Sequence, residues 1–190
     1  MNKRKYFAIG GFAASAILVA FGSVSAVVGY QGRDEVRDTL RQENIVGPED
    51  STIPGQLVDT GSEARAQADI IRHHQMTASN GLTYAEMGRF ATPDGDPKGT
   101  NVAEQAAKDA NGKPVANAVR NQWVTVTALS TSLNTAYFAE QVGLFTIVMG
   151  FALILSGLGF AVLAYGALWR SEKALATKKA TATEFKPVTA

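Results

Sequence analysis

The chain has no cysteine and only two histidines among its 190 residues. The lack of cysteine excludes disulfides, thiolate metal sites, cysteine nucleophiles and anchoring through a lipidated cysteine. No serine or threonine has a histidine base in the context of a catalytic triad. Walker and dinucleotide-binding glycine motifs are absent as well. A segment of this chain exported from the cytoplasm would therefore hold together by packing alone.

Charge is missing from two long stretches, Tyr6–Tyr30 and Gly143–Trp169. Each is longer than the about 20 apolar residues that an α-helix needs to cross a bilayer. We therefore expect an all-α membrane protein with two transmembrane helices, 6–30 and 143–169. A helical extracytoplasmic segment, 31–142, would lie between them. Residues 1–5 would form a cytoplasmic N-terminus and residues 170–190 a cytoplasmic basic tail.

The distribution of charge orients these helices. Basic residues precede the first charge-free stretch and follow the second, whereas the segment between carries 10 Lys and Arg against 15 Asp and Glu. The positive-inside rule then predicts a multi-pass protein of the plasma membrane with both termini in the cytoplasm. The formal net charge of +1 conceals this division, so it does not favour a nucleic-acid partner.

A cleaved signal peptide is the alternative for the first stretch. Basic residues at its start and the small residues Ser23–Ala26 fit that interpretation, although the apolar run exceeds the usual h-region of roughly 7–15 residues. N-terminal sequencing distinguishes the two, because cleavage would give a mature chain that starts at Val27.

Turn residues and helix caps divide the segment between the two stretches. The first helix is expected to continue to Asn44 and to stop at Gly47-Pro48. Three pairs have the spacing of a capping box, in which a side chain at the helix start and an acid three residues later bond each other's backbone N–H groups. They predict helices at 61–79, 84–89 and 101–111, and the pairs are Thr60 with Glu63, Thr83 with Glu86, and Asn101 with Glu104.

A last helix is expected to begin at Pro114 and to run unbroken into the second stretch. Apolar residues recur along it at steps of three or four, which is typical of an amphipathic helix. The β-branched run 123–127 locally favours a strand, but the periodicity on both sides predicts a helix.

Regular glycines mark the second stretch. One set lies at intervals of seven and a second pair is also seven apart, so each set follows one stripe of a helix. We expect a helix-packing interface whose neighbour is either the first transmembrane helix or another protein. The five positions are Gly143, Gly150, Gly157, Gly159 and Gly166.

The only cluster that resembles a metal site is Asp69, His73, His74 and Met76. Adjacent histidines on a helix point about 100° apart and do not readily bind one ion, and a zinc or iron site needs at least three converging ligands. We therefore expect no metal and no cofactor, and we interpret His74 as a packed or partner-facing residue.

The segment Thr60–Met87 resembles part of a family of small actinobacterial two-span membrane proteins of unknown function, in which two helices surround an extracytoplasmic helical segment. The glycine-rich second stretch is similar too. The family is often labelled "aromatic ring-opening dioxygenase", but such enzymes use iron held by two histidines and a carboxylate in facial geometry, which adjacent histidines on a helix do not supply. The residues that carry the resemblance are Ala66, Ala68, Asp69, Ile71, His74, Gly81, Thr83, Tyr84, Ala85 and Glu86.

These observations predict a non-catalytic accessory or structural subunit of a larger membrane complex, either respiratory or of the cell envelope. The glycine-striped helix would pack in the bilayer and the outer segment would dock on a partner. The residues expected to face that partner are Ile71, His74, Tyr84 and Trp123. The alternative is an extracytoplasmic sensor or a module that binds a ligand or metal through His73 and His74.

Overall fold

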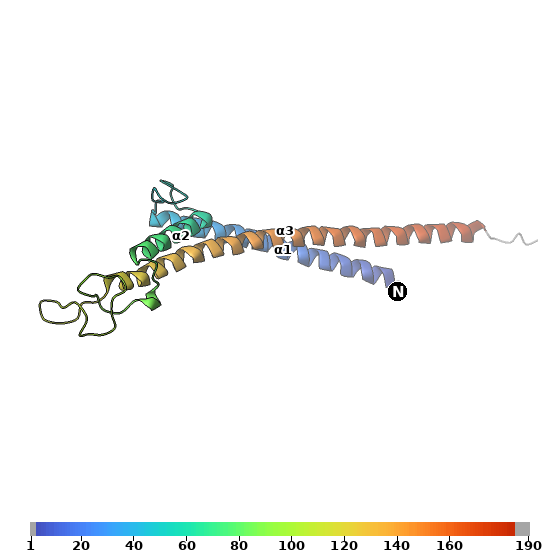
Figure 1. Ribbon diagram of the computed structural model, residues 1–190. Helices are drawn as coiled ribbons and strands as arrows, with labels where there is room; N and C mark the ends of the chain where they lie inside the picture. The colour runs from blue at the N-terminus through green and yellow to red at the C-terminus, as the bar shows by residue number, and fades with distance from the viewer. Residues whose placement is uncertain (1–2, 185–190) are drawn as a thin grey trace, which may run out of the picture. The chain divides into compact units, whose positions relative to one another are not determined.

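The computed structural model describes residues 3–184, with side chains for 5–166. It contains three α-helices, α1 (Lys3–Glu43), α2 (Gly61–Ala78) and α3 (Ala118–Glu184), and the 3₁₀ helix η1 (Tyr84–Glu86) (Figure 1). Within this range the backbone forms isolated β-bridges but no strand. The all-helical prediction is therefore confirmed for the described residues. Residues 1–2 and 185–190 of the two predicted cytoplasmic segments lie outside that range.

Both α1 and α3 contain a segment that is long and apolar enough to cross a membrane. Only 17% of the residues in the most apolar window of α1 are buried, and 22% in that of α3. Large apolar side chains such as Phe7, Ile17, Leu155 and Val162 are exposed instead. These helices therefore differ from the core helix of a soluble domain, whose apolar residues would be covered by the protein itself.

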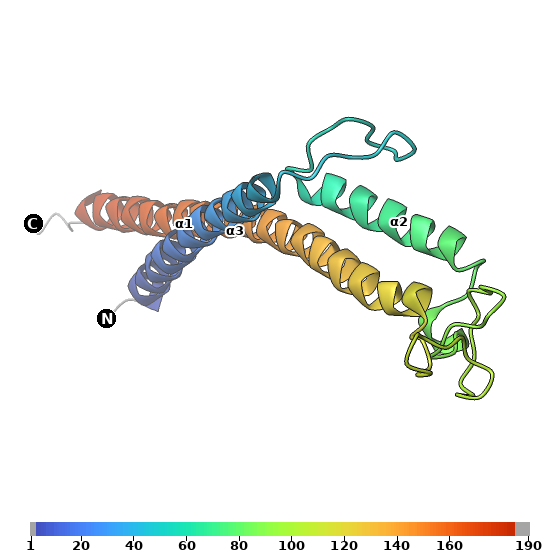
Figure 2. The ribbon, with the colours of Figure 1, turned by 90° about the vertical axis from the view of Figure 1, so that its left-hand side faces the viewer.

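The chain divides into two compact units. The paired-helix unit consists of Met1–Gln31 and Gly143–Ala190, and the central unit consists of Gly32–Val142. In the paired-helix unit, α1 and α3 lie against one another with opposite chain directions (Figure 2).

The core of the central unit consists of two apolar clusters. In the first, the α2 residues Ala64 and Ala68 pack with Leu133 of α3 and with apolar residues of α1 and the loop after it. In the second, Trp123 and Val126 of α3 pack with Met87, which follows η1. Small residues on α2 let it lie close alongside α3, as Figure 1 shows.

The start of α2 has the predicted capping box. Thr60 Oγ1 accepts a hydrogen bond from the Glu63 N–H at 3.4 Å, and Glu63 Oε2 accepts one from the Thr60 N–H at 2.9 Å. This carboxylate oxygen also accepts the Asp59 N–H at 2.9 Å. Donors that the first turn of a helix leaves unsatisfied are thus bonded, and α2 begins one residue after the cap.

The predicted helix at 101–111 is wrong. Asn101 Oδ1 accepts the N–H of Arg89 at 3.1 Å, so the residue expected to cap a helix bonds a neighbouring segment instead. The Ala107 N–H donates to the Ala91 carbonyl and the Val115 N–H donates to the Ala107 carbonyl, both at 2.9 Å or less. These backbone bonds between segments replace the helical ones and keep 88–117 as loops.

The last helix begins at Ala118, not at Pro114. Asn117 is its cap, because Asn117 Oδ1 accepts the Arg120 N–H at 3.2 Å. Pro114 takes part in a β-bridge with Lys108, which holds the residues before Asn117 in an extended conformation. The β-branched run 123–127 is helical as predicted, whereas the second predicted short helix is only the three-residue η1.

Candidate functional site

The glycines of α3 fall on two faces. The inner stripe consists of Gly143, Gly150, Gly157 and Ala164, which are all buried and lie seven residues apart. A Cβ built on Gly150 would lie 2.7 Å from the carbonyl oxygen of Gly22, and one on Gly157 would lie 2.9 Å from that of Ser15. Two of the five glycines are thus positions where a side chain would collide with the backbone of α1.

The matching stripe on α1 is equally short of side chains. A Cβ on Gly22 would lie 2.6 Å from the Gly150 carbonyl oxygen, and one on Gly29 would lie 2.8 Å from the Gly143 carbonyl oxygen. Dispersion and Cα–H contacts hold helices together where backbones come this close. The two helices therefore meet through small residues and leave their large apolar side chains facing away.

The outer glycines, Gly159 and Gly166, have a different environment. A Cβ on either would meet no atom within 4 Å among the described residues. The seven-residue spacing that they share with the inner stripe therefore does not reflect the same contact. Among the side chains at 5–166, the structure brings only the inner stripe against α1.

The central unit contains a buried charge cluster that the sequence did not reveal. Glu140, on α3, is 4% exposed. Its Oε1 lies 2.9 Å from Arg33 Nη2 and 2.6 Å from Arg37 Nη2, and its Oε2 accepts the Gly61 N–H at 2.7 Å. One carboxylate thus connects α1, the first residue of α2 and α3.

Burial alone would raise the pKa of Glu140. The hydrogen bonds from Arg33, the Gly61 N–H and Arg37 outweigh that effect, so the pKa is lowered and the carboxylate stays ionised at neutral pH. The N-terminal end of α2 adds a favourable partial positive charge. A carboxylate with these partners is a structural anchor and has no proton to exchange near pH 7.

Two features of the sequence single out the members of this cluster. Arg33 and Arg37 are one helical turn apart directly after the first charge-free stretch. Glu140 is the one acid in residues 118–142 and lies just before the second stretch. Their pairing could not be derived from spacing, because it depends on how α1 and α3 meet.

His74 and His73 do not converge on one site. His74 Nε2 lies 2.6 Å from Asp50 Oδ2 in the loop after α1, and both side chains are well exposed, at 48% and 59%. This hydrogen bond with His74 is the main cause of a lowered pKa at Asp50. Within the part of the chain that is described, no three His, Asp or Glu residues are grouped to hold a metal ion.

The other residues expected to face a partner differ in how exposed they are. Trp123 is 3% exposed and its indole Nε1 donates to the Leu82 carbonyl at 3.1 Å, so it belongs to the core and is not presented at the surface. Tyr84 is partly exposed, with the Arg120 guanidinium 3.9 Å from its ring centroid. Ile71 is half-buried and packs against both apolar clusters.

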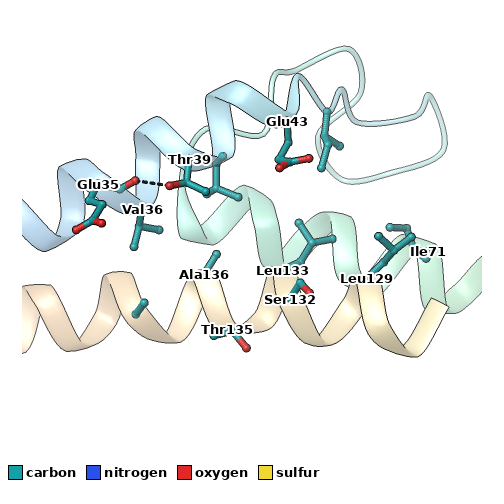
Figure 3. Close-up of a pocket in the computed structure, with 13 residues that line it drawn as sticks. Glu35, Val36, Thr39, Glu43, Ile71, Leu129, Ser132, Leu133, Thr135 and Ala136 are labelled. Atoms are coloured by element: carbon teal, nitrogen blue, oxygen red, sulfur yellow. Dashed lines mark hydrogen bonds between the residues drawn. The ribbon is translucent and has the colours of Figure 1, made fainter. Parts of the chain in front are cut away.

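An apolar groove of about 810 Å³ opens on the central unit. Its lining side chains lie on α1 and α3, with Ile71 contributed by α2 and Ile45 by the loop after α1 (Figure 3). Leu129, at one end, is 49% exposed. Polar residues, among them Glu35 and Glu43 of α1 and Ser132 of α3, line the groove as well.

Comparison with protein-family models, with curated proteins and with solved structures finds no match for this chain. The resemblance to small two-span membrane proteins therefore stays a prediction from the sequence.

Proposed function

We propose that this chain is a non-catalytic accessory subunit of a larger membrane complex, respiratory or of the cell envelope. The helices α1 and α3 cross the plasma membrane, both termini are cytoplasmic and the central unit is extracytoplasmic. The observation that carries the proposal is the contact between the inner stripe of α3 and the matching stripe of α1. The two helices meet through these small residues while their large apolar side chains face outward. Lipid and partner helices would cover those side chains.

The orientation is supported by charge. The central unit is acidic, whereas basic residues dominate both ends of the chain, in agreement with the positive-inside rule. Because the chain has no cysteine, single cysteines can report topology without background labelling. We expect Asn111→Cys to react with a membrane-impermeant maleimide in intact cells, and Lys178→Cys to react only after permeabilisation. The reverse pattern would contradict the proposed orientation.

The hydrogen bonds of the buried polar side chains support the role as a subunit. Glu140, Gln75 and Asn117 are buried, and each bonds another segment of the same unit. Such groups connect helices and loops, which suits a scaffold. The outer glycines, with open space around them, offer a partner helix a place for close approach.

The experiment compares the two glycine faces by the same substitution. Gly159→Leu with Gly166→Leu is expected to release partners from the chain purified in mild detergent while its thermal stability stays unchanged. Gly150→Leu with Gly157→Leu is expected to lower thermal stability, because a leucine there meets the α1 backbone. If partners stay bound to the Gly159→Leu, Gly166→Leu variant at the wild-type ratio, the outer glycines do not contact a partner.

A second candidate is an extracytoplasmic sensor, and the observation that favours it is the exposed pair of His74 and Asp50. Both side chains are exposed, so a ligand or metal outside the cell would have access to them. Two measurements test this candidate. They are metal analysis of the purified chain and amide hydrogen exchange in the loop after α1 at several pH values. If His73→Ala with His74→Ala changes neither, the sensor role has no support.

A further inference from the structure

The groove on the central unit has the geometry of a helix-binding site. Val36 and Leu40 lie one turn apart on α1, and Leu129, Leu133 and Ala136 follow one face of α3. Figure 3 shows Val36 of α1 facing the same space as Leu133 and Ala136 of α3. Apolar residues at helical spacing on two flanking helices match an occupant that presents its own apolar stripe, as in helix-in-groove recognition.

The charges at the groove are of one sign. Glu35 and Glu43 are exposed and lie eight residues apart on α1, which corresponds to about 12 Å along a helix. Neither carboxylate has a basic partner among the ion pairs of the described residues. On the α3 side the polar lining residues, Ser132 and Thr135, are uncharged.

We propose that this groove binds an amphipathic helix of a partner protein, whose apolar stripe fills the floor and whose Lys or Arg residues, about two turns apart, face Glu35 and Glu43. The inference rests on the proposed role as a subunit and specifies the surface of the partner. The acidic balance of the central unit favours the same basic partner at longer range.

The test uses the full chain in nanodiscs of phosphatidylcholine, with empty nanodiscs as the baseline. Two fluorescent helical peptides of about 18 residues carry the same leucine stripe and differ only in two Lys or two Glu at the spacing of Glu35 and Glu43. Each exposed ion pair contributes little by itself, but two Lys attract Glu35 and Glu43 whereas two Glu repel them. We therefore expect the Lys peptide to bind about tenfold more tightly than the Glu peptide. Equal affinity for the two peptides, or no binding above the baseline, would overturn the proposal.

Matched variants locate the binding. Glu35→Lys with Glu43→Lys is expected to reverse the preference between the peptides. Glu49→Lys with Glu104→Lys makes the same change in net charge at exposed acids outside the groove and is expected to leave the preference intact. An equal effect of both pairs would show that only the overall charge matters, which contradicts a site in the groove.

Two tryptophan substitutions, one inside the groove and one outside it, test whether the peptide occupies the groove. Ser132→Trp places a large side chain in the groove, and Thr131→Trp, its exposed neighbour outside the lining, is the control. We expect only Ser132→Trp to abolish binding of the Lys peptide. If Ser132→Trp instead abolishes self-association of the chain, or releases a co-purified lipid that Thr131→Trp retains, the occupant is a second copy or a lipid and the proposal is wrong.

The same variants in the native complex separate this inference from the proposed function. If the wild-type chain is extracted without any partner, the proposed function fails. If partners are present and stay bound in both groove variants, the proposed function stands and the groove proposal falls. Loss of the partner in Ser132→Trp but not in Thr131→Trp, together with the peptide preference, is the result expected.

Discussion

Replacement of Glu140 by glutamine should loosen the junction of three helices in the central unit. The substitution keeps the size of the side chain and one acceptor but removes the charge that faces Arg33, Arg37 and the Gly61 N–H. Breaking a buried ion pair typically costs about 3–5 kcal/mol. The two arginine side chains are 25% and 33% exposed and keep part of their hydration, so we expect a loss of about 2 kcal/mol.

Amide hydrogen exchange at the start of α2 is the direct assay, because the Gly61 N–H donates to Glu140 at 2.7 Å. A loss of about 2 kcal/mol corresponds to exchange that is about 30-fold faster if the amide exchanges by local opening. Glu104→Gln is the control, since Glu104 is exposed and outside the cluster. Unchanged exchange at Gly61 in the Glu140→Gln chain would refute the anchoring role.

Acid should have the same effect as the substitution. Because the pKa of Glu140 is lowered in the folded chain, the unfolded chain binds more protons as the pH falls. The stabilisation is present above the ordinary carboxyl pKa and disappears as the pH falls through the lowered pKa. Protection at Gly61, corrected for intrinsic exchange, should therefore begin to decrease as the pH falls through the ordinary carboxyl range of about 4–5 and should continue to decrease below it. The Glu140→Gln chain should show no such decrease at this amide.

Three further substitutions test individual contacts. Thr60→Ala removes the cap of α2 and should cost about 1 kcal/mol in unfolding measurements, whereas no loss would contradict the observed box. Asn117→Ala removes bonds to the Gly88 and Pro97 carbonyls and should make the loops at 88–117 susceptible to limited proteolysis, with an unchanged cleavage pattern as the contrary result. His74→Ala should speed amide hydrogen exchange in the loop that carries its partner Asp50, and exchange equal to that of the unsubstituted chain would show that the pair has no effect on that loop.

Local rules predicted the helical elements well where the decisive contacts join residues that are only a few positions apart in the sequence. The long apolar helices follow from length and composition, and the start of α2 follows from the spacing of Thr60 and Glu63. The same rule failed at Asn101, because its side chain bonds Arg89 and the backbone around it pairs with other segments. A capping box is thus informative only where no donor from another segment occupies the side-chain acceptor of the cap.

The contacts between distant segments could not be predicted. The glycine spacing identified two stripes on α3 but not which one faces α1, since this depends on the rotation of the helix about its axis. Trp123 was expected to face a partner, yet it fills the second apolar cluster. The pairing of Glu140 with Arg33 and Arg37 likewise depends on the meeting of two helices more than 100 residues apart in the chain.

The mass of the assembly that contains this chain is the most direct test of its proposed role as a subunit. Native mass spectrometry of the tagged full chain, expressed at its natural level and extracted in mild detergent, measures that mass and the stoichiometry of every component. We expect a stable assembly in which this chain is bound to at least one larger membrane protein in a fixed ratio. A chain that is recovered alone, or only with further copies of itself, would contradict it.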